Sequence, residues 1–245
     1  MKPTEFSEIS KLLSNQGTKV LIDHHPNPDV EAFEYLYSRV SASSTAELVF
    51  QFVEAVGLNK FINIDAAKGL YAGIITDTGS FSFACNSPVP YRIVAQLIEL
   101  GIDAEHLHRL IFDNFSESRI RLLGSALSEK MVTLPEFHTA FIILSKTDME
   151  KFNYKAGDSE GIVNYPLSIK EINLSIMLTE RDNLIRISFR SKGDFPANQI
   201  ASEYFEGGGH KNAAGGNSHV SMEETVKKLR NILPLFREQL DFVIS

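Results

Sequence analysis

The chain has 245 residues, of which 43% are hydrophobic and 22% are charged, and its formal net charge is −7. This composition is typical of a globular protein with one large or two ordinary domains. The negative charge argues against a surface that binds long nucleic acid through many phosphates, but it leaves open a small phosphorylated ligand held by a few local cations. The single cysteine, Cys85, excludes an intramolecular disulfide, and no apolar run approaches the roughly 18 residues that cross a bilayer. We therefore expect a soluble cytoplasmic protein.

A buried strand is predicted at residues 20–22, and it ends in Asp23, His24 and His25 before two prolines stop it. In open α/β sheets, ligands bind at the carboxyl ends of strands. If the strand persists to its end, adjacent side chains face opposite sides, so only one imidazole can face a given site. One histidine can then bind a metal while the other touches substrate, with Asp23 orienting a ring. The alternative is a surface turn with incidental histidines.

Helical periodicity dominates residues 1–130. The spacing from Ser44 to Glu47 is that of a capping box and opens an amphipathic helix. Asp65 can cap a second helix, and Gly79 permits a sharp exit that places Asp77 at a helix-to-loop corner. A carboxylate there can be aimed at a ligand, although a capping or turn aspartate is the alternative. The other predicted elements are a short amphipathic helix through Ile9, Leu12 and Leu13, an extended piece at 33–37, and helices at 90–100, 103–111 and 118–130.

Beyond a boundary predicted near residues 125–135, the pattern changes to strands at 137–144 and 173–180. Residues 184–190 alternate with period two after a turn, which predicts a hairpin with Arg186, Ser188 and Arg190 on one face. A helix at 196–205 precedes a glycine-rich segment at 207–216. Ser221 then opens the last amphipathic helix, again with the spacing of a capping box.

Three consecutive glycines lose much backbone entropy on folding, so residues 207–209 need either positive φ or a close approach of the backbone. Peptide N–H groups without side chains in the way form a concavity that binds anions. His210 can donate to a phosphate, and Arg190 could give a bidentate contact. A plain glycine-rich linker remains the alternative for the segment, and a solvated strand residue remains the alternative for Arg190.

Four motifs together resemble those of the DHH phosphoesterases, in order and in approximate spacing. They are Asp23-His24-His25, residues 71–79 around Asp77, Arg190-Ser191 and residues 207–215. The likeness is greatest to the bacterial oligoribonucleases and phosphoadenosine-phosphate phosphatases of that family. It implies an α/β protein with an incomplete Rossmann-like, parallel-sheet DHH domain at 1–130, connecting helix included. A smaller α+β DHH-associated domain at 131–245 would hold the substrate across a cleft.

The resemblance also implies the roles of single residues. His24 and Asp77 would bind one metal of a Mn²⁺ or Mg²⁺ pair, Asp23 would support this site, and His25 would lie near the scissile phosphate. The chemistry would be hydrolysis assisted by two ions about 4 Å apart. The phosphate or base of the terminal nucleotide would be held by Arg190, Gly208, Gly209 and His210.

The chain departs from the family pattern before Asp23. Family members carry a His-x-x-x-Asp-x-Asp motif and a bridging Asp upstream, whereas only 22 residues precede Asp23 here, with Glu5 and Glu8 as their acids. Residues 25–31 imitate the first motif, but they follow Asp-His-His directly, and we interpret this as coincidence. His24 and Asp77 are two ligands where roughly three or four per ion are needed.

We therefore expect the carboxyl-terminal portion of a phosphoesterase that acts on short oligonucleotides, nucleoside bisphosphates or linear dinucleotides. Its incomplete sheet would expose an apolar edge that invites pairing with the missing segment or with a second copy. A second hypothesis is a nucleotide-binding module without catalysis. A third is a remnant that folds poorly and has no function.

Overall fold

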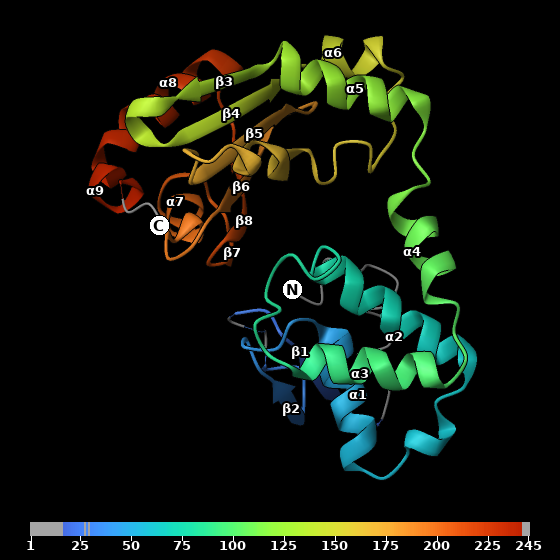
Figure 1. Ribbon diagram of the computed structural model, residues 1–245. Helices are drawn as coiled ribbons and strands as arrows, with labels where there is room; N and C mark the ends of the chain where they lie inside the picture. The colour runs from blue at the N-terminus through green and yellow to red at the C-terminus, as the bar shows by residue number, and fades with distance from the viewer. Residues whose placement is uncertain (1–16, 27, 29, 242–245) are drawn as a thin grey trace. The chain divides into compact units, whose positions relative to one another are not determined.

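The computed structural model describes residues 17–26, 28 and 30–241 (Figure 1). The short helix expected through Ile9, Leu12 and Leu13 lies outside these residues, as do Asn27 and Asp29 of the segment that imitates the upstream motif. The chain divides into two compact units, Met1–Asn114 and Phe115–Ser245. The helix expected at 118–130 groups with the second unit, whereas we assigned it to the first domain. Within the described residues, each helix is too short or too polar to cross a membrane.

The first unit combines a two-stranded parallel sheet with helices, in agreement with the α/β class expected for it. Strand β1 (Val20–Asp23) pairs in parallel with β2 (Tyr35–Ser38), and Asp23 is in register with Ser38. Apolar side chains of this small sheet are exposed, among them Val20 at 43% and Tyr35 at 63%. The prediction of a buried strand at 20–22 was therefore wrong, because Val20 is exposed and the next two residues are only half-buried. The helices of this unit are α1 (Thr45–Ala55), η3 (Asn59–Phe61), α2 (Ile64–Asp77), α3 (Val89–Glu99) and α4 (Ala104–Phe112).

Side-chain caps define where these helices begin. Ser44 accepts a hydrogen bond from the backbone N–H of Glu47 at 3.0 Å, so the predicted start of α1 is confirmed. Helix α2 begins one residue after Asn63, whose side chain accepts from the N–H of Ala66 at 2.9 Å. The prediction of Asp65 as this cap was therefore wrong, because Asp65 already lies in the first turn, where a negative charge is also favourable.

The core of the first unit fixes α2, the helix that ends in Asp77. Its buried members come from α1, α2 and α3 and from the turn after α3, and they are Phe50, Ala67, Tyr71, Ile74, Ile75, Ile93, Val94, Leu97 and Ile102. Burying an apolar side chain of this size contributes roughly 1.5–3 kcal/mol. The carboxyl end of α2 is therefore held by several such contacts.

The second unit is built on a six-stranded mixed sheet with the order β3-β4-β5-β6-β8-β7. Strands β4 and β5 pair in parallel, and the other neighbours pair antiparallel. The strands are β3 (Met131–Leu134), β4 (Thr139–Leu144), β5 (Leu174–Glu180), β6 (Ile185–Ser191), β7 (Gly208–His210) and β8 (Ala213–Ser218). The strands predicted at 137–144, 173–180 and 184–190 are confirmed, whereas β3, β7 and β8 were not predicted as strands.

Each face of this sheet carries its own core. Alternate residues of β5 and β6, such as Ile176 and Phe189, pack with α7 and α8 on one face. Met177 points to the opposite face, where α5 and η5 cover the sheet. The remaining elements of this unit are α5 (Glu117–Ser128), η4 (Pro135–Phe137), α6 (Lys146–Lys151), η5 (Ile162–Ser168), α7 (Ala197–Tyr204), α8 (Met222–Ile232), η6 (Leu233–Phe236) and α9 (Arg237–Leu240).

Candidate functional site

Strand β1 ends at Asp23, so His24 and His25 lie just beyond it. The alternation of a strand therefore does not separate the two imidazoles. Their ring centroids are 4.6 Å apart, with the planes at 73° in an edge-to-face arrangement. Both rings thus lie at the carboxyl end of β1, and the expectation that only one can face this region does not apply.

The His24 ring is buried and is oriented by a backbone carbonyl. Its Nδ1 lies 3.3 Å from the carbonyl oxygen of Ala42. Because a carbonyl oxygen only accepts, Nδ1 carries the hydrogen in this contact, and Nε2 is the acceptor of the neutral ring. Nε2 lies 3.4 Å from Oδ2 of Asp77. The lone pair of Nε2 and a carboxylate oxygen at this distance are two donor atoms that a single cation could share.

Asp77 is the last residue of α2, as the prediction of a helix-to-loop corner requires. The buried Thr78 hydroxyl closes the helix by donating to the Ile74 carbonyl at 2.7 Å and accepting from the Phe81 N–H at 3.1 Å. Gly79 then turns the chain with a φ of +53°. The side chain of Asp77 is 43% exposed. Its carboxylate therefore stands at the surface next to a buried imidazole.

Asp23 and His25 form a second hydrogen-bonded pair. The carboxylate oxygen of Asp23 accepts from the ring Nδ1 of His25 at 2.7 Å and from the His25 backbone N–H at 3.2 Å. Burial raises the pKa of Asp23, but the hydrogen bonds from His25 outweigh it, and the pKa lies below its ordinary value. Asp23 is therefore ionised at neutral pH and orients the His25 ring.

Glu47 is a buried carboxylate next to this site, and the sequence analysis did not assign it a role there. Glu47 accepts from the backbone N–H of Ser43 at 2.9 Å, from the Ser43 hydroxyl at 2.6 Å and from the Gln51 amide at 3.1 Å. These bonds fix the chain next to Ala42, whose carbonyl contacts His24. The capping-box spacing was the available signal, but the Glu47 side chain reaches Ser43 rather than the capping residue.

In the second unit, the glycine-rich segment forms the hairpin of β7 and β8. A Cβ on Gly207 would lie 2.0 Å from the carbonyl oxygen of Gly215, and Gly209 has a φ of +139°. The close backbone approach that we predicted is therefore confirmed, and the approaching group is the neighbouring strand. Nothing lies within 4 Å of a Cβ on Gly208. Gly208 is thus a position of this segment that leaves open space.

Strand register places Arg190 and His210 in one row across the sheet. Arg190 on β6 pairs with Ala213 on β8, and Ala213 pairs with His210 on β7. Directly paired residues share a face, so the two side chains project from the same face, two strand spacings or about 10 Å apart. The structure thus brings together the two residues predicted to hold a phosphate.

The guanidinium of Arg190 is partly buried and donates to the carbonyl of Phe189 at 2.8 Å. Burial lowers the pKa of Arg190, and the charge of Glu160 partly offsets this effect. Among the residues that the structure describes, no carboxylate oxygen lies within 4.0 Å of Arg190. A partly buried cation without a close counter-charge is costly, and an anionic ligand would offset that cost.

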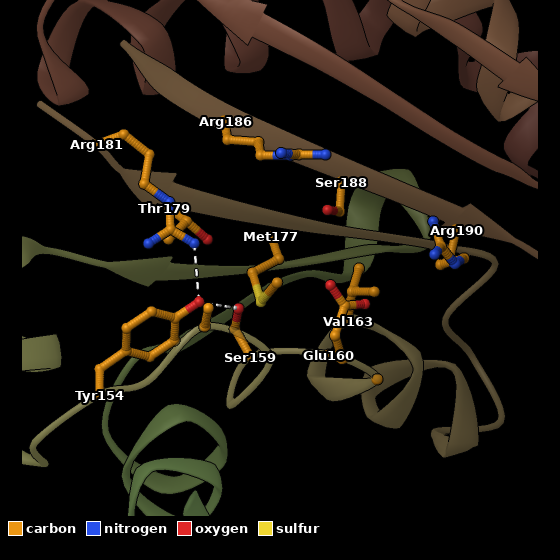
Figure 2. Close-up of a pocket in the computed structure, with 13 residues that line it drawn as sticks. Tyr154, Ser159, Glu160, Val163, Met177, Thr179, Arg181, Arg186, Ser188 and Arg190 are labelled. Atoms are coloured by element: carbon orange, nitrogen blue, oxygen red, sulfur yellow. Dashed lines mark hydrogen bonds between the residues drawn. The ribbon is translucent and has the colours of Figure 1, made fainter. Parts of the chain in front are cut away.

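Arg190 also lines a cavity of about 340 Å³ that lies wholly within the second unit. Strands β5 and β6 form one wall, and the segment from Tyr154 to Val163 forms the other (Figure 2). Its polar lining includes Tyr154, Ser159, Thr179, Arg181, Arg186 and Ser188. The size falls at the lower end of the range of small-molecule sites. Sequence reasoning placed Arg186, Ser188 and Arg190 on one face but did not foresee the cavity.

Comparison with known proteins gives consistent matches. Residues 136–239 match the DHHA1 domain. The chain is 30% identical over 224 residues to the bifunctional oligoribonuclease and PAP phosphatase NrnA of Bacillus subtilis (strain 168), covering 91% of this chain and 69% of that protein. It is 31% identical over 247 residues to the cyclic-di-AMP phosphodiesterase GdpP of Bacillus subtilis (strain 168), covering 97% of this chain and 35% of that protein.

A solved structure agrees with these matches. The exopolyphosphatase-related protein from Bacteroides fragilis superposes with a TM-score of 0.90 at 39% identity, over 98% of this chain and 70% of that one. The motifs, the DHHA1 match and the long alignments point to the same group of hydrolases. The chain belongs to the DHH phosphoesterases with a DHHA1 domain, the family of the NrnA oligoribonucleases and phosphatases.

Proposed function

We propose that the chain takes part in metal-dependent hydrolysis of phosphate esters in short oligonucleotides or nucleoside bisphosphates. The first unit would supply metal ligands, and the second unit would supply groups that bind the anionic substrate. The observation that carries this proposal is the distance of 3.4 Å between Nε2 of His24 and Oδ2 of Asp77. The names of the relatives, which describe activity on oligoribonucleotides, PAP and cyclic di-AMP, support it.

The pair formed by His24 and Asp77 fits a divalent cation of the Mn²⁺ or Mg²⁺ class. Two adjacent ligands at about 2.1 Å from an octahedral ion lie about 3 Å apart, close to the distance observed here. The hydrogen bond of Nδ1 to Ala42 fixes the ring in the orientation that a metal-binding histidine usually receives from such a contact. When bound, a divalent cation supplies charge neutralisation at the phosphate and activation of the attacking water.

Asp23 and His25 would act next to the scissile phosphate. Because Nδ1 of His25 donates to Asp23, Nε2 is the atom of the neutral ring that accepts a proton. The ionised Asp23 stabilises the ring once it becomes charged, so His25 can take up and return a proton at Nε2. Asp23 is thus a positioning residue in this proposal, and His25 is the residue that touches the substrate.

Arg190 and His210 would hold the phosphate of the terminal nucleotide in the second unit. Their shared face and the absence of a close carboxylate around Arg190 among the described residues support this role. Gly208 leaves room for the ligand, whereas Gly209 serves the conformation of the hairpin. A charge-assisted hydrogen bond from a guanidinium gives both affinity and orientation.

The test is a hydrolysis assay with Mn²⁺ and a panel of dinucleotides and trinucleotides, on the chain joined to an upstream segment that carries the His-x-x-x-Asp-x-Asp motif. We expect release of mononucleotide, and we expect Asp77→Asn to abolish that release. Asp65→Asn, which removes a carboxylate at the other end of α2, is the matched control and should remain active. Absence of mononucleotide from the whole panel at saturating Mn²⁺ would overturn the proposal.

A nucleotide-binding module without catalysis is the second candidate, and the number of metal donors favours it. Among the described residues, the pair formed by His24 and Asp77 supplies two ligands, fewer than the roughly three or four protein ligands expected for each ion of a catalytic pair. Calorimetry with a mononucleotide, with and without Mn²⁺, separates the two functions. Binding that is independent of Mn²⁺ and not followed by turnover identifies the module. A homodimer, pairing with a further segment and a cytoplasmic location stay predictions.

A further inference from the structure

We propose that the cavity of the second unit contains a second anion-binding subsite, centred on Arg186, that takes a further phosphate group of the substrate. This inference rests on the proposed function, in which Arg190 binds the first phosphate. The ligand class is a nucleotide with phosphates on two sides of a nucleoside. Both a nucleoside bisphosphate and a short oligonucleotide have this chemistry.

The charge of the cavity lining supports an anionic ligand. Three arginines, Arg181, Arg186 and Arg190, line the cavity, and Glu160 is the acidic residue among its lining residues. This positive excess stands in a chain whose formal net charge is −7. Among the ion pairs of the described residues, none involves any of the three arginines. None of the three guanidinium groups therefore has a carboxylate oxygen within 4.0 Å among the described residues, so each can pair with an anionic ligand.

The strand geometry sets the distance between the two subsites. Arg186 and Arg190 are four residues apart on the same face of β6, which separates their Cα atoms by about 13 Å. Figure 2 shows the Arg186 side chain extending along the strand toward Ser188, which shortens the gap to Arg190, so a nucleoside with a phosphate on each side can bridge it. Ser188 lies between the two arginines and presents a hydroxyl to the same cavity.

At the end of the cavity away from Arg190, hydrogen bonds fix the position of Arg181. Nη2 of Arg181 donates to the Tyr154 hydroxyl at 2.9 Å, and this hydroxyl lies 3.2 Å from the hydroxyl of Ser159. Figure 2 shows this chain of hydrogen bonds at one end of the cavity and Arg190 at the other, with Arg186 and Ser188 along the strand between them. The wall opposite Arg186 is thus held in place before a ligand binds, which lowers the entropy lost on binding.

The experiment is calorimetric titration of the full chain without divalent cations, so that binding is measured apart from hydrolysis. The ligands are adenosine 5′-monophosphate, adenosine 3′,5′-bisphosphate and a 5′-phosphorylated adenine dinucleotide. We expect the wild type to bind the ligands with two phosphates about tenfold more tightly than the monophosphate. Arg186→Gln should reduce this preference to about twofold and leave the affinity for the monophosphate unchanged.

Two further variants keep the test sharp. Arg186→Lys retains the charge and should keep most of the preference. Arg237→Gln removes an exposed arginine on α9, outside the cavity lining, and should behave as the wild type. The second subsite is refuted if Arg186→Gln keeps the full preference for ligands with two phosphates, or if it lowers the affinity for all ligands by the same factor. It is also refuted if no ligand binds the wild type. Failure of the proposed function shows separately, as absence of hydrolysis with Mn²⁺. A preference for only one of the two larger ligands identifies the source of the second phosphate.

Discussion

Replacing Asp23 by Asn tests the hydrogen-bonded pair at the end of β1. The carboxylate accepts from Nδ1 and from the backbone N–H of His25, and its side chain is 11% exposed. Hydrogen bonds to a charged partner contribute roughly 1.5–3 kcal/mol, and the 38% exposure of the His25 side chain points to the lower end. We therefore expect Asp23→Asn to lower the free energy of unfolding of the first unit by about 1.5 kcal/mol at pH 7.

The pH dependence of this loss gives a sharper test than its size. The pKa of Asp23 is lowered in the folded state, whereas an aspartate in the unfolded chain titrates near 3.9. The stabilisation is therefore fully present above about pH 4 and disappears as the pH falls through the lower, folded-state pKa. The difference between wild type and variant should be at least as large at pH 5 as at pH 7 and should shrink by pH 3.

Urea unfolding followed by far-ultraviolet circular dichroism measures this difference, because the chain contains no tryptophan to report by fluorescence. Asp65→Asn is the control, since its carboxylate is 88% exposed and forms only a surface ion pair with Lys68. Such a pair contributes about 0–1 kcal/mol. A variant as stable as wild type at pH 7, or a difference that persists unchanged at pH 3, would refute the reasoning.

Four further results follow from the structure. Asp77→Asn should weaken Mn²⁺ binding at least about tenfold in calorimetry, with little loss of stability because its side chain is 43% exposed. Arg190→Gln should weaken nucleotide binding about tenfold while the circular dichroism spectrum stays unchanged. Gly207→Ala should destabilise the second unit by about 3 kcal/mol or more, because its Cβ would lie 2.0 Å from the Gly215 carbonyl oxygen; an unchanged melting temperature would contradict this. Gly208→Ala, with nothing within 4 Å, should fold normally and lower only nucleotide affinity.

The sequence predicted the start of a helix correctly where only one polar residue was placed to cap it. Ser221 caps α8 and forms a complete capping box with Glu224, as the spacing indicated. At α2, Asn63 and Asp65 stand two residues apart, and either side chain can stabilise a helix start. The sequence could not choose between them, because the choice depends on which backbone N–H each side chain reaches in the folded chain.

The cavity could not be predicted, because its walls come from distant parts of the chain. The alternation of residues 184–190 correctly placed Arg186 and Arg190 on one face. It gave no indication that the segment around Tyr154 and Ser159 covers that face, because such packing is a long-range contact without a periodic signal. The sequence predicted that the backbone at residues 207–209 packs closely, but as part of a loop. In the structure these glycines pack against strand β8, whose own glycines let the two segments lie together.

The parallel pairing of β4 with β5 forces a long crossover between Leu144 and Leu174, and this connection carries the outer wall of the cavity. Residues 154–163 belong to no strand of the sheet, so substitutions there leave the strand register unchanged. The strand wall of the cavity, with Arg186 and Arg190, and the opposite wall are thus encoded by separate stretches of sequence. Exchanging this stretch alone between homologous proteins should alter which nucleotide is accepted without rebuilding the strands beneath it.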